Sequence, residues 1–162
     1  MRVLVFLVGV LATTVAGADV FDAERGQWMI ANTSTACRAL NRPAADFNYA
    51  PYDALQIVAR ANNTIGVEVF FWPKAIDPSR DYRLQLNFSP GSSMTLDAKP
   101  AMGDYMLSAS DDAGKLWAMF QKTTTLVVTV EGEPRLDLFF GLDDISWVLT
   151  KLQSCARLLP RT

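Results

Sequence analysis

The feature that most restricts the fold of this chain is its pair of cysteines. Cys37 and Cys155 are the only cysteines among 162 residues, and they lie near opposite ends of the sequence. A disulfide between them would close a loop that contains most of the chain, which in the chain-entropy account gives up to about 4 to 5 kcal/mol of stabilisation. The pair lacks the C-x-x-C spacing of redox-active thiols, so a structural bond is favoured over a redox function.

The N-terminal segment predicts an oxidising destination for these cysteines. An apolar run over residues 3–15 follows a basic residue and precedes the Ala-Gly-Ala site of residues 16–18. This layout is typical of a secretory signal peptide, and the run is shorter than the roughly 20 residues that span a membrane. We therefore expect a signal peptide over residues 1–18 and one globular domain over 19–162, periplasmic or secreted, with no integral membrane segment after cleavage. In such a compartment two cysteines favour one disulfide over two free thiols.

The composition narrows the function classes. Half of the residues are apolar and 20% are charged, which is typical of a globular domain rather than a disordered or fibrous chain. The chain contains no histidine, which excludes Ser-His-Asp and Cys-His nucleophile systems and histidine-containing zinc sites. The formal net charge is −2 and the basic residues are scattered, so the sequence offers no electrostatic basis for binding nucleic acid. We expect no cofactor and no metal site.

Paired carboxylates are the remaining candidates for catalysis, because glycosidase-type chemistry needs two carboxyl groups that face each other. The acidic groupings are Asp111-Asp112, Glu131/Glu133 and Asp143-Asp144. Two of these groupings precede predicted helices and the third lies in a predicted turn, where capping and turn roles account for them. We therefore predict no catalytic residue and a protein that is not an enzyme.

Alternating apolar and polar residues predict a β-rich chain. The clearest alternation lies in residues 82–88, where Tyr82, Leu84, Leu86 and Phe88 share one face. Further strands are predicted over residues 26–31, 35–40, 55–61, 66–72, 93–98, 104–110, 124–130 and 135–140. The turn-forming residues between them favour an antiparallel meander.

Two helices complete the expected fold. A short amphipathic helix is predicted near residues 112–122, with one of the two aspartates at its start as the N-cap. A C-terminal helix is predicted near residues 143–158, where two aspartates complement the helix N-terminus. Its apolar stripe consists of Ile145, Val148, Leu149, Leu152, Cys155 and Leu159. The predicted fold class is α+β and β-rich: an antiparallel sheet or small β-sandwich, onto which a Cys37–Cys155 bond would clamp the last helix.

The order of elements at the two ends resembles that of a known family. Gly26, Trp28 and Cys37 open the domain, and residues 116–155 close it with a helix, a Val-rich strand, a short strand, Gly141, a helix and a cysteine. These features resemble the invasion-associated locus B proteins, which are small exported proteins of alphaproteobacteria. This chain departs from that family in having two cysteines and no cysteine-bearing middle segment. The resemblance implies a small envelope or secreted β-rich protein with a C-terminal helix, and it supplies no catalytic residue.

Several aromatic residues interrupt the expected alternation. Phe70 and Trp72 share a strand face with Glu68, Phe139 lies opposite its apolar neighbours, and Trp147 lies off the stripe of the last helix. One interpretation is that helices or a loop cover this second face. The other is that the rings are exposed together and form a surface for a partner or ligand.

A long connection over residues 41–53 contains Tyr49 and Tyr52. Connections of this length are usually functional or packed by their own side chains. Because a functional loop would place these rings at the surface, we include both tyrosines among the candidate partner-binding residues.

Three functions remain open at this point. The leading hypothesis is an exported, non-enzymatic interaction protein of the bacterial cell envelope that binds another envelope protein. Its candidate partner-binding residues are Phe70, Trp72, Trp147, Tyr49 and Tyr52. The alternatives are a small-ligand or lipid-binding module, which needs an apolar cavity between sheet and helix, and an inhibitor or immunity-type protein that would use the 41–53 loop.

Overall fold

The structure is a computed structural model that describes residues 23–41, 53–62, 64–71, 74, 76–101, 103–111 and 114–160. Within these residues the chain forms one antiparallel sheet of ten strands and two α-helices. The strands are β1 (Ala23–Arg25), β2 (Trp28–Asn32), β3 (Ala36–Asn41), β4 (Ala54–Arg60), β5 (Ile65–Phe70), β6 (Tyr82–Phe88), β7 (Ser92–Ala101), β8 (Met106–Asp111), β9 (Thr125–Val130) and β10 (Leu138–Gly141). The helices are α1 (Lys115–Phe120) and α2 (Ile145–Ala156). The predicted β-rich α+β class is confirmed.

The strand order is β1-β2-β3-β4-β5-β8-β7-β6-β9-β10, with every neighbouring pair antiparallel. β5 therefore pairs with β8, and the β6–β8 segment is inserted in reverse order. The predicted simple meander is wrong at this point. Alternation specifies which face a residue occupies but not which strand lies next to it, so the sequence pattern is the same for both orders.

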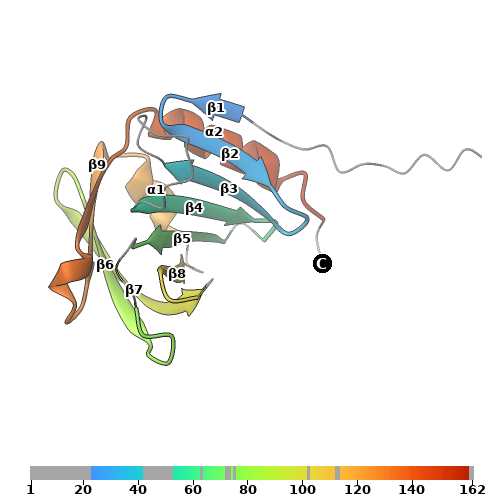
Figure 1. The fold of residues 1–162 in the computed structure, drawn as a ribbon. Helices are drawn as coiled ribbons and strands as arrows, with labels where there is room; N and C mark the ends of the chain where they lie inside the picture. Colours follow the sequence, from blue (N-terminus) through green and yellow to red (C-terminus); the bar gives the residue numbers. More distant parts are fainter. Residues whose placement is uncertain are drawn as a thin grey trace, which may run out of the picture.

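The sheet is strongly curled, so that one face becomes the interior. In Figure 1 strands β1–β5 run across the view with α2 behind the first of them, whereas β6, β7 and β9 run steeply at the left. The predicted inward residues of β6, namely Tyr82, Leu84, Leu86 and Phe88, are all buried. Phe88 meets Phe120 of α1 edge-to-face, with ring centroids 5.2 Å apart. α1 therefore closes the interior beside the β6–β10 half of the sheet.

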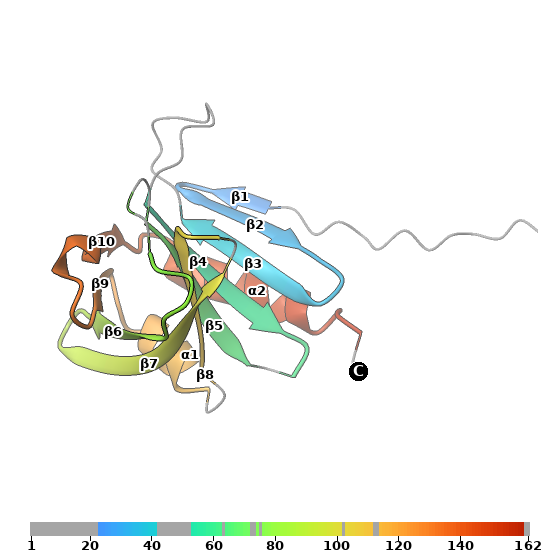
Figure 2. The same cartoon turned by 60° about the horizontal axis from the view of Figure 1, so that its bottom comes forward.

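α2 packs against β2, β3 and β4 on this interior face. In the rotated view of Figure 2 it lies behind β3 and β4. Its predicted apolar stripe is confirmed, since every member from Ile145 to Cys155 is buried, as is Leu159 just beyond the helix. Cys155 is bonded to Cys37 of β3 across a sequence separation of 118, with Cα atoms 6.1 Å apart. The predicted clamp of the last helix onto the sheet is therefore present.

The boundaries of α1 and β10 differ from the predicted ones because a glycine and a proline determine the local backbone conformation. α1 begins after Gly114, which occupies the N-cap position with a φ of 71°. Asp111 ends β8, but its carboxylate accepts the Leu116 N–H in the first turn of α1 at 2.6 Å, so one of the two predicted aspartates does satisfy a donor at the helix start. The predicted 135–140 strand is split, because Pro134–Leu136 forms a 3-10 turn in which the Leu136 N–H bonds to the Glu133 carbonyl.

Asp144 occupies the N-cap position of α2, as predicted, with a φ of 61°. Its side chain, however, makes no capping hydrogen bond to the helix. Its carboxylate pairs with Arg25 instead, as described below. No helix in the described part of the chain is long and apolar enough to cross a membrane.

Candidate functional site

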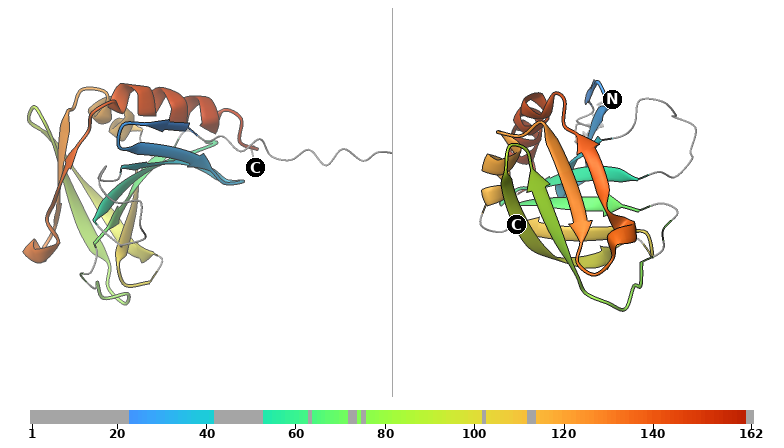
Figure 3. Two further views of the ribbon diagram at one scale, coloured as in Figure 1. Left: turned by 45° about the horizontal axis from the view of Figure 1, so that its top comes forward. Right: turned by 90° about the vertical axis from the view of Figure 1, so that its left-hand side faces the viewer.

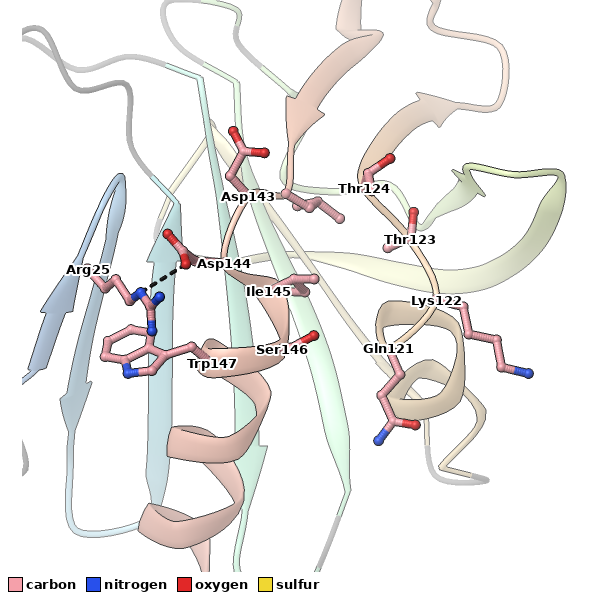
Figure 4. Close-up of a pocket in the computed structure, with 11 residues that line it drawn as sticks. Arg25, Gln121, Lys122, Thr123, Thr124, Asp143, Asp144, Ile145, Ser146 and Trp147 are labelled. Atoms are coloured by element: carbon pink, nitrogen blue, oxygen red, sulfur yellow. Dashed lines mark ion pairs between the residues drawn. The ribbon is translucent and has the colours of Figure 1, made fainter.

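An open cleft lies where the end of α1 meets the start of α2. Its volume is about 590 Å³, and Figure 4 shows its lining side chains. The lining residues are Arg25, Gln121, Lys122, Thr123, Thr124, Leu142, Asp143, Asp144, Ile145, Ser146 and Trp147. Three segments far apart in sequence thus contribute to one surface: the β1–β2 turn, the segment after α1, and the start of α2.

Side chains from the early strands fix the chain segment that leads into α2. The Trp28 indole Nε1 donates to the Asp143 carbonyl at 2.8 Å. The Gly141 carbonyl accepts both the Gln27 Nε2 at 2.8 Å and the Asn41 Nδ2 at 2.9 Å. Since an indole N–H needs a partner when it is buried, the burial of Trp28 at 1% exposure depends on this contact.

A close approach between the β1–β2 turn and the start of α2 reinforces this attachment. The Arg25 Nε lies 2.8 Å from the Asp144 Oδ1. Gly26 has a φ of 56°, and a Cβ there would lie 3.3 Å from the Asp144 Oδ2. A side chain at residue 26 would therefore be strained by the left-handed backbone and would crowd the carboxylate that holds Arg25.

Trp147 is the aromatic group at the mouth of the cleft. It is partly buried against the core, although it lies off the apolar stripe of α2. The Arg25 guanidinium carbon lies 5.8 Å from the ring centroid and the Lys151 Nζ lies 6.0 Å from it, both within cation–π range. Figure 4 shows the Arg25 guanidinium next to both the Trp147 ring and the Asp144 carboxylate. Two cationic side chains therefore lie against the Trp147 ring and favour this orientation.

The rim of the cleft is polar and carries both charge signs. Lys122 and Gln121 lie on the α1 side, with Asp143 and the exposed Ser146 on the α2 side. A half-buried aromatic ring with a polar rim is the arrangement found at protein–protein contacts. The described residues hold no group of three or more His, Cys, Asp or Glu that could bind a metal ion.

No family model matches this chain, and no curated protein matches it. A solved structure does share its fold. The crystal structure of invasion associated protein B from Bartonella henselae aligns with 83% of this chain and 96% of that chain, with a TM-score of 0.59 and 18% sequence identity. At this identity the likeness establishes the fold alone. It agrees with the fold expected from the resemblance to the invasion-associated locus B proteins.

Of the five predicted aromatic residues the structure describes Phe70 and Trp147, and these two lie on opposite sides of the sheet. Phe70 pairs with Met106 on the outer face of the sheet, beside Glu68, which forms an ion pair with Arg38 at 3.6 Å. α2 lies on the opposite, interior face, so Phe70 is separated from Trp147 by the sheet. Trp72, Tyr49 and Tyr52 lie outside the described residues.

Phe139 differs from Phe70 in its surroundings. Its side chain is 67% exposed on the outer face of β10, and neither described helix covers it. The interpretation that helices cover this second face is therefore wrong for Phe139.

Asp143 and Asp144 were singled out from the sequence, but as helix-start residues, and the other cleft residues before α2 were not identified. Arg25 and Gly26 lie in a short polar turn, and Gln121 and Lys122 follow a short helix; neither pattern indicates a site. The Gly26-x-Trp28 pattern could have pointed to this region, because both residues lie against the segment that precedes α2.

Proposed function

We propose that this chain is an exported, non-enzymatic interaction protein of the bacterial cell envelope and a distant relative of the invasion-associated locus B proteins. The apolar leader supports export, as does a disulfide that joins two buried residues. The fold shared with a protein named for its association with invasion supports an envelope role. The partner is another protein, and it binds at the cleft between α1 and α2.

The observation that carries this proposal is the setting of Trp147. The ring is half-buried, oriented by Arg25 and Lys151, and placed at the mouth of an open cleft of about 590 Å³. Trp and Arg are the residues most enriched at binding hot spots. A ring that is already held in place loses little conformational entropy when a partner binds, so more of its contact energy is available for affinity.

The packing beneath α2 favours protein binding over the lipid-binding alternative. A lipid module would need apolar space between α2 and the sheet. Ile30, Ile57, Val148 and Leu152 fill this region and are fully buried. The open cleft lies outside this packed layer and has a polar rim, which suits a protein partner.

Site-specific photo-crosslinking in the source bacterium tests the cleft. A photoreactive residue at Ser146 should crosslink to a discrete envelope protein, because Ser146 is exposed and lines the cleft. Ser154 is the matched control, since it is an exposed serine about 12 Å further along the same helix. Trp147→Ala should remove the crosslink from residue 146 while the circular dichroism spectrum stays unchanged. Equal crosslinking from both positions, or a crosslink that survives Trp147→Ala, would contradict the proposal.

Export is tested separately by fractionation and N-terminal sequencing of the mature protein. We expect recovery from the envelope or the medium, with Asp19 as the first residue. Recovery of a chain that begins at Met1 in the cytoplasm, with two alkylatable thiols, would remove the basis for an envelope role.

A further inference from the structure

The outward face of β6, β7, β9 and β10 is a second open surface, whose residues do not line the cleft. α1 and α2 pack on the interior side of the sheet, so neither described helix covers this face. The right-hand view of Figure 3 looks onto β6, β9 and β10, with the first strands and α2 behind them. We call this surface the outer polar face. Its residues are Arg83, Gln85, Asn87, Ser93, Thr95, Asp97, Val127, Thr129, Glu131 and Phe139.

The strand register arranges these side chains in rows across the sheet. Gln85 lies between Thr129 of β9 and Thr95 of β7. In the neighbouring row Asn87 lies between Val127 and Ser93, and Val127 is opposite Phe139. Directly opposed side chains have Cβ atoms about 5 Å apart, so each row offers closely spaced hydroxyl and amide groups.

A shallow hollow of about 300 Å³ marks one end of this face. Arg83, Gln85, Thr95 and Glu131 line it. The Arg83 Nη1 lies 3.2 Å from the Glu131 Oε2, so the two charges neutralise each other. The hollow thus combines a planar guanidinium, a planar amide and a carboxylate, which can donate and accept paired hydrogen bonds without a net charge.

Phe139 provides an apolar platform at the other end of the face. It is the most exposed aromatic side chain in the described part of the chain, at 67%. It lies one row along from Gln85 and two strands away, a distance of roughly 12 Å at ordinary strand spacings. A ligand that covers this ring would remove apolar surface from water, which would contribute favourably to the free energy of binding.

We propose that the outer polar face binds a neutral oligosaccharide of two or three sugar rings. The apolar C–H face of one ring packs on Phe139, while hydroxyl groups of the next rings bond to Asn87, Gln85 and the Arg83–Glu131 pair. The cleft combines Trp147 with Leu142 and Ile145, whereas this face offers one exposed phenyl ring, which is less than the apolar centre of a protein interface. A nucleic acid or anionic polymer would require an excess of positive charge, whereas the charges in the hollow are balanced.

Titration of the purified mature protein, followed by NMR, tests this proposal independently of the proposed protein partner. The probes are chitotriose, cellotriose and maltotriose, each taken to 10 mM. We expect saturable shifts of the Gln85 and Asn87 side-chain amides with at least one probe. Phe139→Ala and Gln85→Ala should each raise the Kd at least tenfold, and both variants should keep the wild-type dispersion of the spectrum because their side chains are exposed.

The control variant is Trp147→Ala, which alters the cleft and should leave saccharide binding unchanged. Absence of saturable shifts with all three probes would overturn the proposal. Shifts centred on the cleft, or a Kd that neither Phe139→Ala nor Gln85→Ala changes, would overturn it equally. Tighter binding of an anionic trisaccharide such as trigalacturonate would also contradict it, because the proposal requires a neutral ligand.

Discussion

The two halves of the sheet are held together in different ways. Strands β1–β5 are attached to the end of the chain by the Cys37–Cys155 bond and by the buried indole of Trp28. The half that contains β6–β10 carries ion pairs at its surface, namely the exposed Arg83–Glu131 pair and the pair between Arg80 and the half-buried Glu133. The first half is therefore tied to the C-terminal segment by a covalent bond and a buried indole, whereas the second half is held by strand pairing and by its buried inner face, which packs against α1.

This difference explains where the two open surfaces lie. The buried attachments of the first half fix the start of α2, and with it the orientation of Trp147 at the cleft. Neither described helix covers the outward side of the second half, so the outer polar face is accessible to a ligand. Variants of the first half should therefore affect global stability, whereas surface variants of the second half should affect it little.

The largest predicted effect comes from removing the disulfide. Cys37→Ala combined with Cys155→Ala should lower the free energy of unfolding by about 3 to 5 kcal/mol, because the bond closes a loop of 118 residues. Urea denaturation of the variant and of the oxidised wild-type protein measures this loss. The reduced wild-type protein should resemble the variant. A loss below about 1 kcal/mol would show that the helix packing alone holds the first half together.

The next effect concerns the packing of α2. Leu152→Ala should cost about 2 to 5 kcal/mol, because the fully buried side chain leaves a cavity between the helix and the sheet. Leu158→Ala is the matched control, since this leucine is 76% exposed and its truncation should change stability by less than about 0.5 kcal/mol. Equal effects of the two substitutions would mean that α2 is not part of the folding core.

The sequence predicted those features that rest on a single periodicity or on covalent chemistry. The alternation of residues 82–88 reproduced β6 with the same boundaries, and the i, i+3, i+4 pattern from Ile145 to Cys155 identified the buried face of α2. The disulfide followed from the number of cysteines and the leader. In each of these cases the local sequence pattern and the tertiary structure favour the same arrangement.

The features that could not be predicted depend on contacts between distant segments. Asp144 is at the N-cap position that the sequence predicts, but its carboxylate pairs with Arg25 rather than with the helix N–H groups, which no local pattern indicates. The pairing of β5 with β8 and the cleft itself arise from the path of the chain, about which alternation carries no information. Trp147 departs from the helical spacing and was singled out for that reason, but its neighbours Arg25 and Lys151 carry no such sequence signal.

A smaller effect is expected from Trp28, which links the first strands to the segment before α2. Trp28→Phe should cost about 1 to 3 kcal/mol, since it leaves the Asp143 carbonyl without the indole donor and removes buried volume. Thermal unfolding followed by circular dichroism measures the change. Phe139→Ala serves as the control from the second half and should stay within about 0.5 kcal/mol of the wild-type protein. A neutral Trp28→Phe would indicate that the disulfide alone fixes the start of α2.

The smallest effect concerns the exposed charges of the second half and appears as a pH dependence. Hydrogen bonds from Arg135 and then Arg80 lower the pKa of Glu133 below its ordinary value of 4.5. Because the pKa is lower in the folded state, the resulting stabilisation is fully present above about pH 4.5 and is lost as the pH falls through the folded-state pKa. Glu133→Gln should therefore be slightly less stable than the wild-type protein at pH 7, and the difference should shrink steadily as the pH falls below 4.5. Urea denaturation between pH 7 and pH 2.5 measures this convergence, and hydrogen exchange should locate it at the turn between β9 and β10. A constant difference at every pH would mean that the carboxylate of Glu133 acts through packing rather than charge, and the contrast between the two halves would then lose its electrostatic part.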